Sequence, residues 1–161
     1  MTKRINKVIS GKRGDSVRSD CYFEIELKNS GGIKTDLKSK VDVMYGESIK
    51  QMILDMSKYF GLKDAKILCE DNGALPFILA ARFELAVKRL FFDLKKEYLL
   101  PFHANNLYST KKDQLRRSRL YLPGNEPKFF VNAGLHSPDG IILDLEDSVA
   151  PSEKDAAQLL V

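Results

Sequence analysis

The chain has 161 residues, of which 43% are hydrophobic and 30% are charged. This composition is typical of a globular protein and supplies enough apolar side chains for one good core and a small appendage. No apolar run approaches the roughly 20 residues that span a bilayer, and the first residues lack the apolar centre of a signal peptide. We therefore expect a cytoplasmic protein that makes no contact with a membrane.

The net charge of +4 is concentrated at the amino end of the chain. The first twenty residues hold six basic and two acidic side chains, which accounts for the whole excess. Residues 1–20 are therefore predicted to be a basic flexible arm that solubilises the chain or attracts a phosphate-rich cofactor or an acidic partner. The arm lacks the interleaved aromatic side chains that stack on bases, so we do not expect it to bind nucleic acid.

Two runs of alternating side chains follow the arm. Apolar and polar side chains alternate over residues 21–27 and again over residues 33–38, as expected for strands with one buried face. Gly31 and Gly32 lie in the turn between them, so the sequence predicts a hairpin. Cys21, like Cys69 further along the chain, lies in such an alternating run and has no partner at metal-ligand spacing. Both are predicted to be buried thiols.

The next segment, residues 39–45, is compatible with either a helical turn capped by Ser39 or a short strand. From residue 47 the apolar side chains recur at helical spacing, which predicts a helix over residues 47–60. Gly61 follows as the residue expected to end this helix in the left-handed conformation.

A third strand is predicted over residues 65–70 and is followed by a turn. A long helix then begins near Pro76, because proline is suited to a first helical turn. A fourth strand over residues 75–82 before that helix is the alternative. Either way, residues 21–96 are predicted to form a two-layer α/β (α+β) domain. Its predicted core consists of Phe23, Ile25, Ile53, Met56, Ile67, Phe83 and Val87.

Residues 97–115 have no sustained period and are predicted to be a linker. The isolated His103 in this linker is not expected to take part in catalysis. Residues 116–161 then contain two apolar β-like runs, each followed by a helical pattern, which is typical of successive β/α units in a parallel sheet or barrel. Such strands need neighbours on both sides, so we expect residues 116–161 to be inactive by themselves.

This last segment contains two specific sequence motifs. Residues 116–125, RRSRLYLPGN, and residues 144–151, DLEDSVAP, resemble the start of the citrate lyase β subunit and of related HpcH/HpaI aldolases, including malyl-CoA and citramalyl-CoA lyases. The resemblance implies the first two β/α units of a TIM barrel, whose site lies at the strand ends. The magnesium ligands of those lyases lie on later strands, so the resemblance implies no metal ligand within this chain.

The resemblance also implies roles for five side chains. Tyr121 and Lys128 match positions that contact a CoA-type substrate, whereas Asp144, Glu146 and Asp147 match an acidic strand end near the metal and substrate. The alternative for the three acids is structural, because carboxylates often follow a strand and offset the exposed N–H groups of a helix start.

The amino half resembles a second family. Residues 20–25, DCYFEI, residues 71–75, DNGAL, and residues 81–83, ARF, are similar to the acyl carrier, or γ subunit, of citrate lyase and to the acyl carrier of malonate decarboxylase. In that family a serine holds a phosphoribosyl-dephospho-CoA group through a phosphodiester. The terminal thiol of this group carries acetyl or citryl groups between active sites.

The attachment residue remains open between three alternatives. When Asp20 is matched to the family aspartate, Arg18 occupies the usual position of the modified serine. Ser19 lies one place later, whereas Ser16 follows an aspartate as in ordinary phosphopantetheine carriers. The third alternative is an unmodified arm.

The two resemblances together predict an acyl carrier domain that presents a thioester-bound acyl group to a lyase cleaving carbon–carbon bonds. The expected partners are citrate lyase-type catalytic subunits or the remainder of the chain's own barrel, in an oligomer that acts on acyl-CoA or an acyl carrier. The alternative function is an unmodified docking or oligomerisation module at the start of a magnesium-dependent acyl-CoA lyase.

Overall fold

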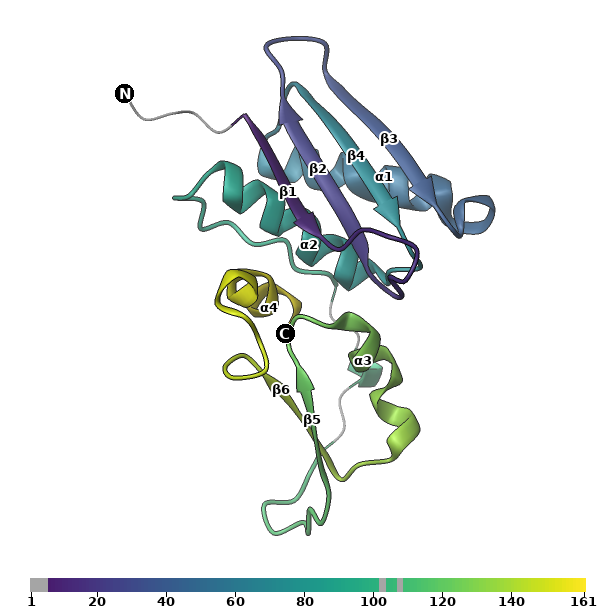
Figure 1. Ribbon diagram of the computed structural model, residues 1–161, viewed down its shortest axis with the longest axis vertical. Helices are drawn as coiled ribbons and strands as arrows, with labels where there is room; N and C mark the ends of the chain where they lie inside the picture. Colours follow the sequence, from purple (N-terminus) through teal and green to yellow (C-terminus); the bar gives the residue numbers. More distant parts are fainter. Residues whose placement is uncertain (1–5, 102–103, 107–108) are drawn as a thin grey trace.

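The computed structural model describes residues 6–101, 104–106 and 109–161 (Figure 1). Within these ranges no helix combines the length and the apolar character that a membrane crossing requires. His103 lies outside the described residues. The strands and helices are, in chain order, β1 (Lys7–Gly11), β2 (Cys21–Leu27), β3 (Ile33–Ser39), α1 (Asp42–Phe60), β4 (Ala65–Asp71), α2 (Pro76–Leu90), β5 (Arg119–Pro123), α3 (Pro127–Asn132), β6 (Gly140–Asp144) and α4 (Lys154–Leu160).

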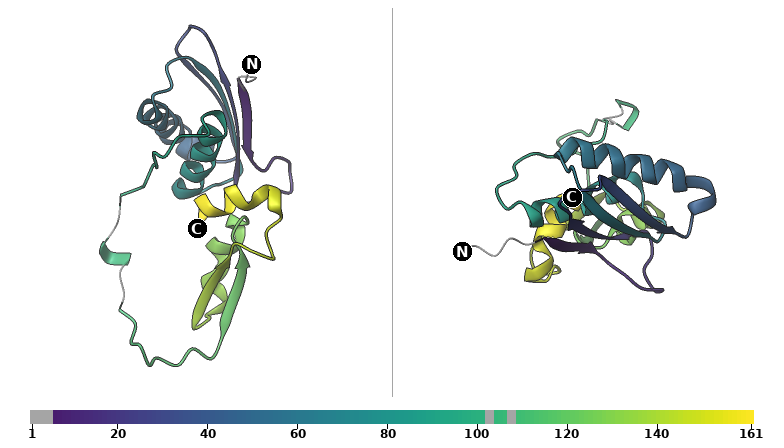
Figure 2. Two further views of the ribbon diagram at one scale, coloured as in Figure 1. Left: turned by 90° about the vertical axis from the view of Figure 1, so that its left-hand side faces the viewer. Right: turned by 90° about the horizontal axis from the view of Figure 1, so that it is seen from above.

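The amino half is a four-stranded sheet covered on one face by α1 and α2 (Figure 2). The strand order is β1-β2-β4-β3. Strand β2 pairs antiparallel with both β1 and β4, whereas β3 pairs parallel with β4. Helix α1 connects β3 to β4, as a parallel pair requires, so the domain has the two layers that the sequence predicts.

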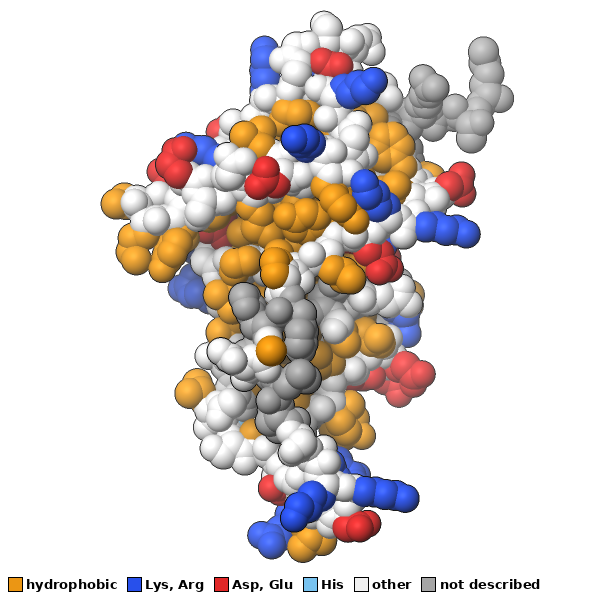
Figure 3. Space-filling model, turned by 180° about the vertical axis from the view of Figure 1, so that it is seen from behind, with side chains coloured by type: hydrophobic (Ala, Val, Ile, Leu, Met, Phe, Trp, Pro, Cys, Tyr) orange, Lys and Arg blue, Asp and Glu red, His pale blue; other side chains and the backbone are white. Residues whose placement is uncertain are grey.

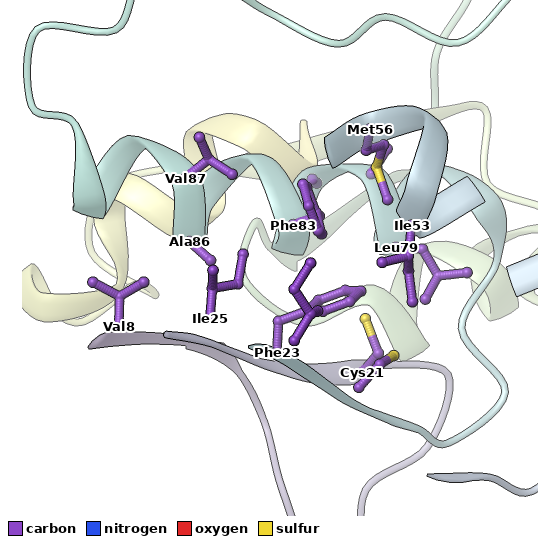
Figure 4. Packing of buried hydrophobic residues seen from close by; sticks show 14 of the residues in the cluster. Val8, Cys21, Phe23, Ile25, Ile53, Met56, Leu79, Phe83, Ala86 and Val87 are labelled. Atoms are coloured by element: carbon purple, nitrogen blue, oxygen red, sulfur yellow. The ribbon is translucent and has the colours of Figure 1, made fainter. Parts of the chain in front are cut away.

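The core lies between the sheet and the two helices (Figure 4). The seven predicted core side chains are all fully buried, which confirms that prediction. The Phe23 and Phe83 rings meet edge to face with their centroids 5.4 Å apart and so join β2 to α2. Both cysteines are also buried and free, as predicted.

The predicted hairpin is wrong, although both of its strands exist. Strand β4 lies between β2 and β3, so the turn at Gly31 and Gly32 crosses over β4 and joins two strands that do not pair. The side chains of β4 are alternately buried, whereas no side chain of β3 is fully buried. The more apolar β4 therefore takes the central position and leaves β3 at the edge, where fewer apolar side chains are needed.

The predicted flexible arm is also wrong for residues 7–11. These residues form β1, which pairs with β2 over its full length and buries Val8 and Ser10. A strand with only two buried side chains, Val8 and Ser10, therefore pairs with the edge of β2. Among the described charges that suggested an arm, Lys7 lies at an exposed position of this strand, whereas Lys12, Arg13 and Arg18 lie in the loop that follows it.

The segment over residues 39–45 is divided between the two alternatives. Ser39 is the last residue of β3, and helix α1 begins at Asp42. The predicted cap by Ser39 is wrong, because α1 has no side-chain cap. The Ser39 hydroxyl instead accepts a hydrogen bond of 3.0 Å from the Val41 N–H group in the turn before the helix. Gly61 ends α1 in the left-handed conformation, as predicted. Helix α2 begins at Pro76, so the alternative of a strand over residues 75–82 is wrong.

The carboxyl segment forms a second, smaller layer beside the first domain. Strands β5 and β6 pair in parallel, with α3 between them in the chain. A long connection leads from α2 around to β5, and α4 returns to pack along α2 (Figure 2). Arg89 of α2 forms two hydrogen bonds of 2.9 Å with the carboxylate of Asp155 of α4. The arrowhead of β5 points toward the amino domain in Figure 1, and β6 runs parallel to β5, so the carboxyl ends of both strands face that domain.

Candidate functional site

The two candidate serines lie in the loop between β1 and β2, which we call the serine loop (residues 12–20). This loop is tied to the turn between β4 and α2. The Ser19 N–H group donates to the Asn72 carbonyl oxygen at 3.0 Å, and the Asn72 N–H group donates to the Asp20 carbonyl oxygen at 3.0 Å. The sequence motifs that begin at Asp20 and Asp71 are therefore held together by two backbone hydrogen bonds.

The turn after β4 is fixed by a buried aspartate. Asp71 is 2% exposed. One of its carboxylate oxygens accepts a hydrogen bond of 2.7 Å from the Ala74 N–H group, and the other accepts one of 2.6 Å from the Ser39 hydroxyl. The side chain of Asp71 thus bridges its own turn to the end of β3. The D-x-G-A sequence therefore forms a turn that is held in place by hydrogen bonds and that contacts the serine loop.

A buried ion pair holds the other side of the serine loop. Asp20 and Arg82 are 2% and 1% exposed. Arg82 donates from Nε and Nη2 to the two carboxylate oxygens of Asp20 at 2.9 and 2.7 Å, the two-pronged geometry that favours arginine over lysine. Burial disfavours the charged form of the guanidinium. The hydrogen bonds to Asp20 and the charge of Asp20 have the opposite effect, and the pKa of Arg82 is raised. The residue after Ser19 is therefore locked in place.

Arg82 also explains part of the sequence pattern. It lies three residues after Leu79 and four before Ala86, on the buried face of α2. A charged side chain on such a face requires a buried partner, and Asp20 stands directly before a strand whose first residues are buried. This signal was present in the sequence, but the pair was not predicted.

The two serines have different environments. Ser16 is exposed and lies in a turn closed by a hydrogen bond of 3.2 Å from the Val17 N–H group to the Gly14 carbonyl oxygen. Ser19 is partly buried and has a φ of 50°, in the left-handed region that few non-glycine residues adopt. Ser16 is the more accessible of the two, whereas Ser19 is the more firmly positioned.

Arg18 occupies the position at which the modified serine usually lies. Its side chain lies on the outer surface of the serine loop. Its guanidinium is exposed and donates hydrogen bonds to the carbonyl oxygens of Asp15 and Val17, at 3.0 and 3.3 Å. These contacts are local to the loop. They leave the positive charge of Arg18 in solvent beside both serines.

A small polar cavity of about 150 Å³ lies between the serine loop and the start of α3. Lys12, Ser16 and Arg18 line it from one side, and Glu126 and Lys128 line it from the other. Lys12 pairs with Glu126, and the Lys128 ammonium lies 3.7 Å from the same carboxylate. Three cations and two carboxylates, those of Asp20 and Glu126, thus line the cavity beside Ser16. This donor set suits the phosphates of a phosphodiester-linked group.

Lys128 is the one predicted substrate-binding residue that the fold brings to the serine loop. No pattern in the sequence predicts this proximity, because it depends on the path of the long connection after α2. Tyr121, in β5, is 66% exposed and does not line this cavity. Asn125 was also missed, although its carbonyl oxygen accepts a hydrogen bond of 3.3 Å from Arg82.

The three acids after β6 are arranged around a turn. Asp144 accepts hydrogen bonds of 2.9 Å from the N–H groups of Glu146 and Ser148, and the bonds from Ser148 and Glu146 lower its pKa. Glu146 and Asp147 are exposed. Among the described residues no three His, Cys, Asp or Glu side chains are grouped so as to hold a metal ion. These acids do not fit a magnesium site on their own.

Two family models match the chain in succession. Residues 11–90 match the model described as malonate decarboxylase delta subunit, an acyl carrier protein model. Residues 117–161 match the model described as HpcH/HpaI aldolase/citrate lyase. The boundary between the two matches falls in the long connection between α2 and β5.

Curated relatives divide in the same way. The citrate lyase acyl carrier protein of Fusobacterium nucleatum subsp. nucleatum is 35% identical over 79 residues, which are 49% of this chain and 84% of that protein. The citrate lyase acyl carrier protein of Vibrio cholerae is 38% identical over 71 residues, 44% of this chain and 72% of that protein. No solved structure matches the chain.

The carboxyl segment is similar to the citrate lyase subunit beta of Haemophilus influenzae, with 50% identity over 48 residues. This stretch is 30% of the present chain but only 16% of that relative. The similarity is therefore to about one sixth of that subunit.

Proposed function

Because the chain belongs to the citrate lyase acyl carrier protein family, we propose that its amino domain presents a thioester-bound acyl group to a carbon–carbon lyase. The observation that carries this function is the double anchoring of the serine loop. The Asp20–Arg82 pair and the Ser19–Asn72 hydrogen bond fix both sides of Ser19. A fixed attachment point beside an exposed turn suits a residue that must meet several partner enzymes.

The group attached would be phosphoribosyl-dephospho-CoA, whose terminal thiol supplies the thioester chemistry when it is bound. Ser19 is the first candidate for attachment, and Ser16 is the second. Lys12, Arg18 and Lys128 would hold the phosphates through charge-assisted hydrogen bonds. The serine loop itself would contribute no reacting group beyond the hydroxyl that carries the arm.

A second candidate function is an unmodified docking or oligomerisation module. The observation that favours it is Arg18, which occupies the usual place of the modified serine and donates only to its own loop. In this case the cluster of Lys12, Arg18 and Lys128 would bind the phosphates of free acyl-CoA. The two functions differ in one respect that can be measured, the presence of a covalent bond to serine.

The carboxyl segment would supply the first two β/α units of a TIM-barrel lyase. In a chain of full barrel length, Tyr121 and Lys128 would contact the CoA-type substrate. Asp144, Glu146 and Asp147 would border a magnesium site completed by later strands. The partners of the amino domain would then be citrate lyase-type catalytic subunits or its own barrel, assembled as an oligomer.

Reconstitution tests the carrier function. Citrate lyase catalytic subunits prepared without their carrier should regain citrate cleavage when the loaded form of this chain is added. The matched control is the same chain with both Ser16→Ala and Ser19→Ala. Failure of the loaded chain, where a loaded carrier from a relative succeeds, would contradict the proposed function.

The lyase assignment needs a separate comparison. A chain in which residues 116–161 continue to full barrel length should cleave a citryl- or malyl-type thioester in the presence of magnesium, whereas the 161-residue chain should not. Cleavage by the short chain would contradict the expectation that this segment is inactive by itself. Absence of cleavage by the long chain would contradict the lyase assignment.

A further inference from the structure

An apolar groove of about 410 Å³ opens between the first turns of α1 and α2, and the mechanism above does not use it. Its volume is in the range of small-molecule sites in proteins. The floor is formed by Ile49 and Leu79, which are 5% and 3% exposed. The remaining lining residues come from both helices and from the turn after β4: Val41, Tyr45, Ser48, Met52, Gly73, Ala74, Leu75 and Pro76.

The groove begins where the serine loop is anchored. Asn72 accepts the hydrogen bond from Ser19, and Gly73, the next residue, lines the groove. That hydrogen bond of 3.0 Å and three covalent bonds separate the Ser19 nitrogen from the Gly73 Cα atom, so the two atoms lie within about 7 Å of one another. A long flexible group attached at Ser19 would therefore reach the groove without any movement of the backbone.

The rim of the groove exposes apolar side chains. Tyr45 is 52% exposed and Leu75 is 45% exposed. Next to them on α1, Met44 is 74% exposed. Hydrophobic side chains also gather on the face of the molecule that carries the two helices (Figure 3). An apolar patch that surrounds a recess is typical of a ligand or interaction site.

We propose that this groove binds the pantetheine end of the acyl arm carried by the serine loop and shelters its thioester from water. This inference rests on the proposed function. The gem-dimethyl and methylene groups of pantetheine are apolar and match the floor formed by Ile49 and Leu79. The two amides of pantetheine can remain hydrated at the open mouth, so their hydrogen bonds need not be lost.

Because the arm is tethered, even a low affinity of the groove for the arm is enough to keep the groove occupied. Attachment at the serine loop gives the arm an effective concentration in the millimolar range near the groove. An arm that spends about nine-tenths of its time in the groove exposes its thioester for the remaining tenth, so hydrolysis slows about tenfold. The arm can still leave the groove quickly enough to enter a partner enzyme.

The test uses the full chain loaded with an acetyl arm and compares two phenylalanine substitutions on α1. Ser48→Phe fills the groove, because Ser48 lines it. Gln51→Phe adds the same side chain at an exposed position of α1 that does not line the groove. Both positions are exposed, so both variants should fold. The two readouts are the rate of thioester hydrolysis and the methyl resonances of Met52 and Ile49.

We expect loading to shift both methyl resonances in the unmodified sequence and in Gln51→Phe, but not in Ser48→Phe. Hydrolysis should be up to about tenfold faster in Ser48→Phe than in the other two. Equal hydrolysis rates and unshifted resonances in a loaded chain would overturn the proposed binding of the arm in the groove, but would leave the carrier function intact. Shifts that occur only when citrate lyase catalytic subunits are added would identify a protein-docking surface instead, which also overturns the inference.

The inference can also be decided if no serine accepts the arm. Free S-acetyl-pantetheine is then titrated into the unloaded chain. Saturable shifts at Met52 and Ile49, lost in Ser48→Phe, would support the groove even though covalent carriage had failed. The absence of any shift up to millimolar probe would overturn it.

Discussion

Asp20 and Arg82 bury two opposite charges at the foot of the serine loop. Burying a charge is costly unless it is paired, and removal of one partner leaves the other uncompensated. The pair also joins the end of the serine loop to α2 and, through the Asn125 carbonyl oxygen, reaches the loop after β5. Its expected role is to hold Ser19 in one position.

We expect Asp20→Asn to lower the free energy of unfolding by about 3–5 kcal/mol, because Arg82 would keep its charge without a buried anion. The matched control is Asp155→Asn, which breaks a similar two-pronged pair with Arg89 at the surface. That change should cost less than about 1 kcal/mol. Urea denaturation of both variants measures the difference, and equal losses would contradict this role of the buried pair.

The buried thiols make stability depend on pH. Desolvation raises the pKa of both Cys21 and Cys69 above the ordinary value of 9.0. Above that value the unfolded chain loses its thiol protons while the folded chain keeps them, so the free energy of unfolding falls as pH rises. The loss approaches about 1.4 kcal/mol per thiol for each pH unit.

A double variant, Cys21→Ala with Cys69→Ala, isolates this contribution. It should be less stable overall, but its free energy of unfolding should fall less steeply between about pH 9 and pH 10.5 than that of the unmodified chain. Denaturant titrations at several pH values give the two slopes. Identical slopes would show that the thiols are not protected by burial.

At the scale of the elements, α2 is the helix on which the amino domain depends. Phe83→Ala should cost about 3–5 kcal/mol, because it leaves a cavity against Phe23 and removes an edge-to-face contact. The control is Phe92→Ala, just after α2, where the ring is 80% exposed and the expected change is within about 0.5 kcal/mol. A loss below about 1 kcal/mol at Phe83 would contradict the packing of α2 on the sheet.

The end of β1 makes a second prediction about elements. Gly11 and Gly61 have similar positive φ angles, 79° and 75°. An added Cβ at Gly61 would meet no atom, whereas one at Gly11 would collide with the Cys21 carbonyl oxygen. Gly61→Ala should therefore cost about 1–2 kcal/mol from conformation alone, and Gly11→Ala should cost about 1–3 kcal/mol more. Equal melting temperatures would contradict the close approach of β1 to β2.

The sequence predicted individual elements better than their pairing. Alternation identified β2 and β4, and helical spacing identified α1 and α2, because these patterns record which side chains meet the core. Alternation does not record which strand lies alongside, so the hairpin was wrong. The short strand β1 was missed because it lies within a basic segment, and its own basic side chain, Lys7, is at an exposed position of an edge strand.

At the scale of the whole molecule, the serine loop lies against a segment more than one hundred residues further along the chain. Lys12 pairs with Glu126, and Lys128 shares the same carboxylate. Each of these side chains was visible in the sequence, and Lys128 was singled out for a different reason. Their meeting depends on the long connection after α2, which carries no periodic signal.

The central claim is that a serine of this loop carries a covalent acyl arm. The most direct measurement is the intact mass of the chain after incubation with a citrate lyase prosthetic-group transferase and its nucleotide substrate. We expect one mass increment, which Ser19→Ala abolishes, or Ser16→Ala if the exposed serine is the attachment site. No increment, under conditions in which a genuine citrate lyase carrier is modified, would contradict the claim and favour the unmodified docking module.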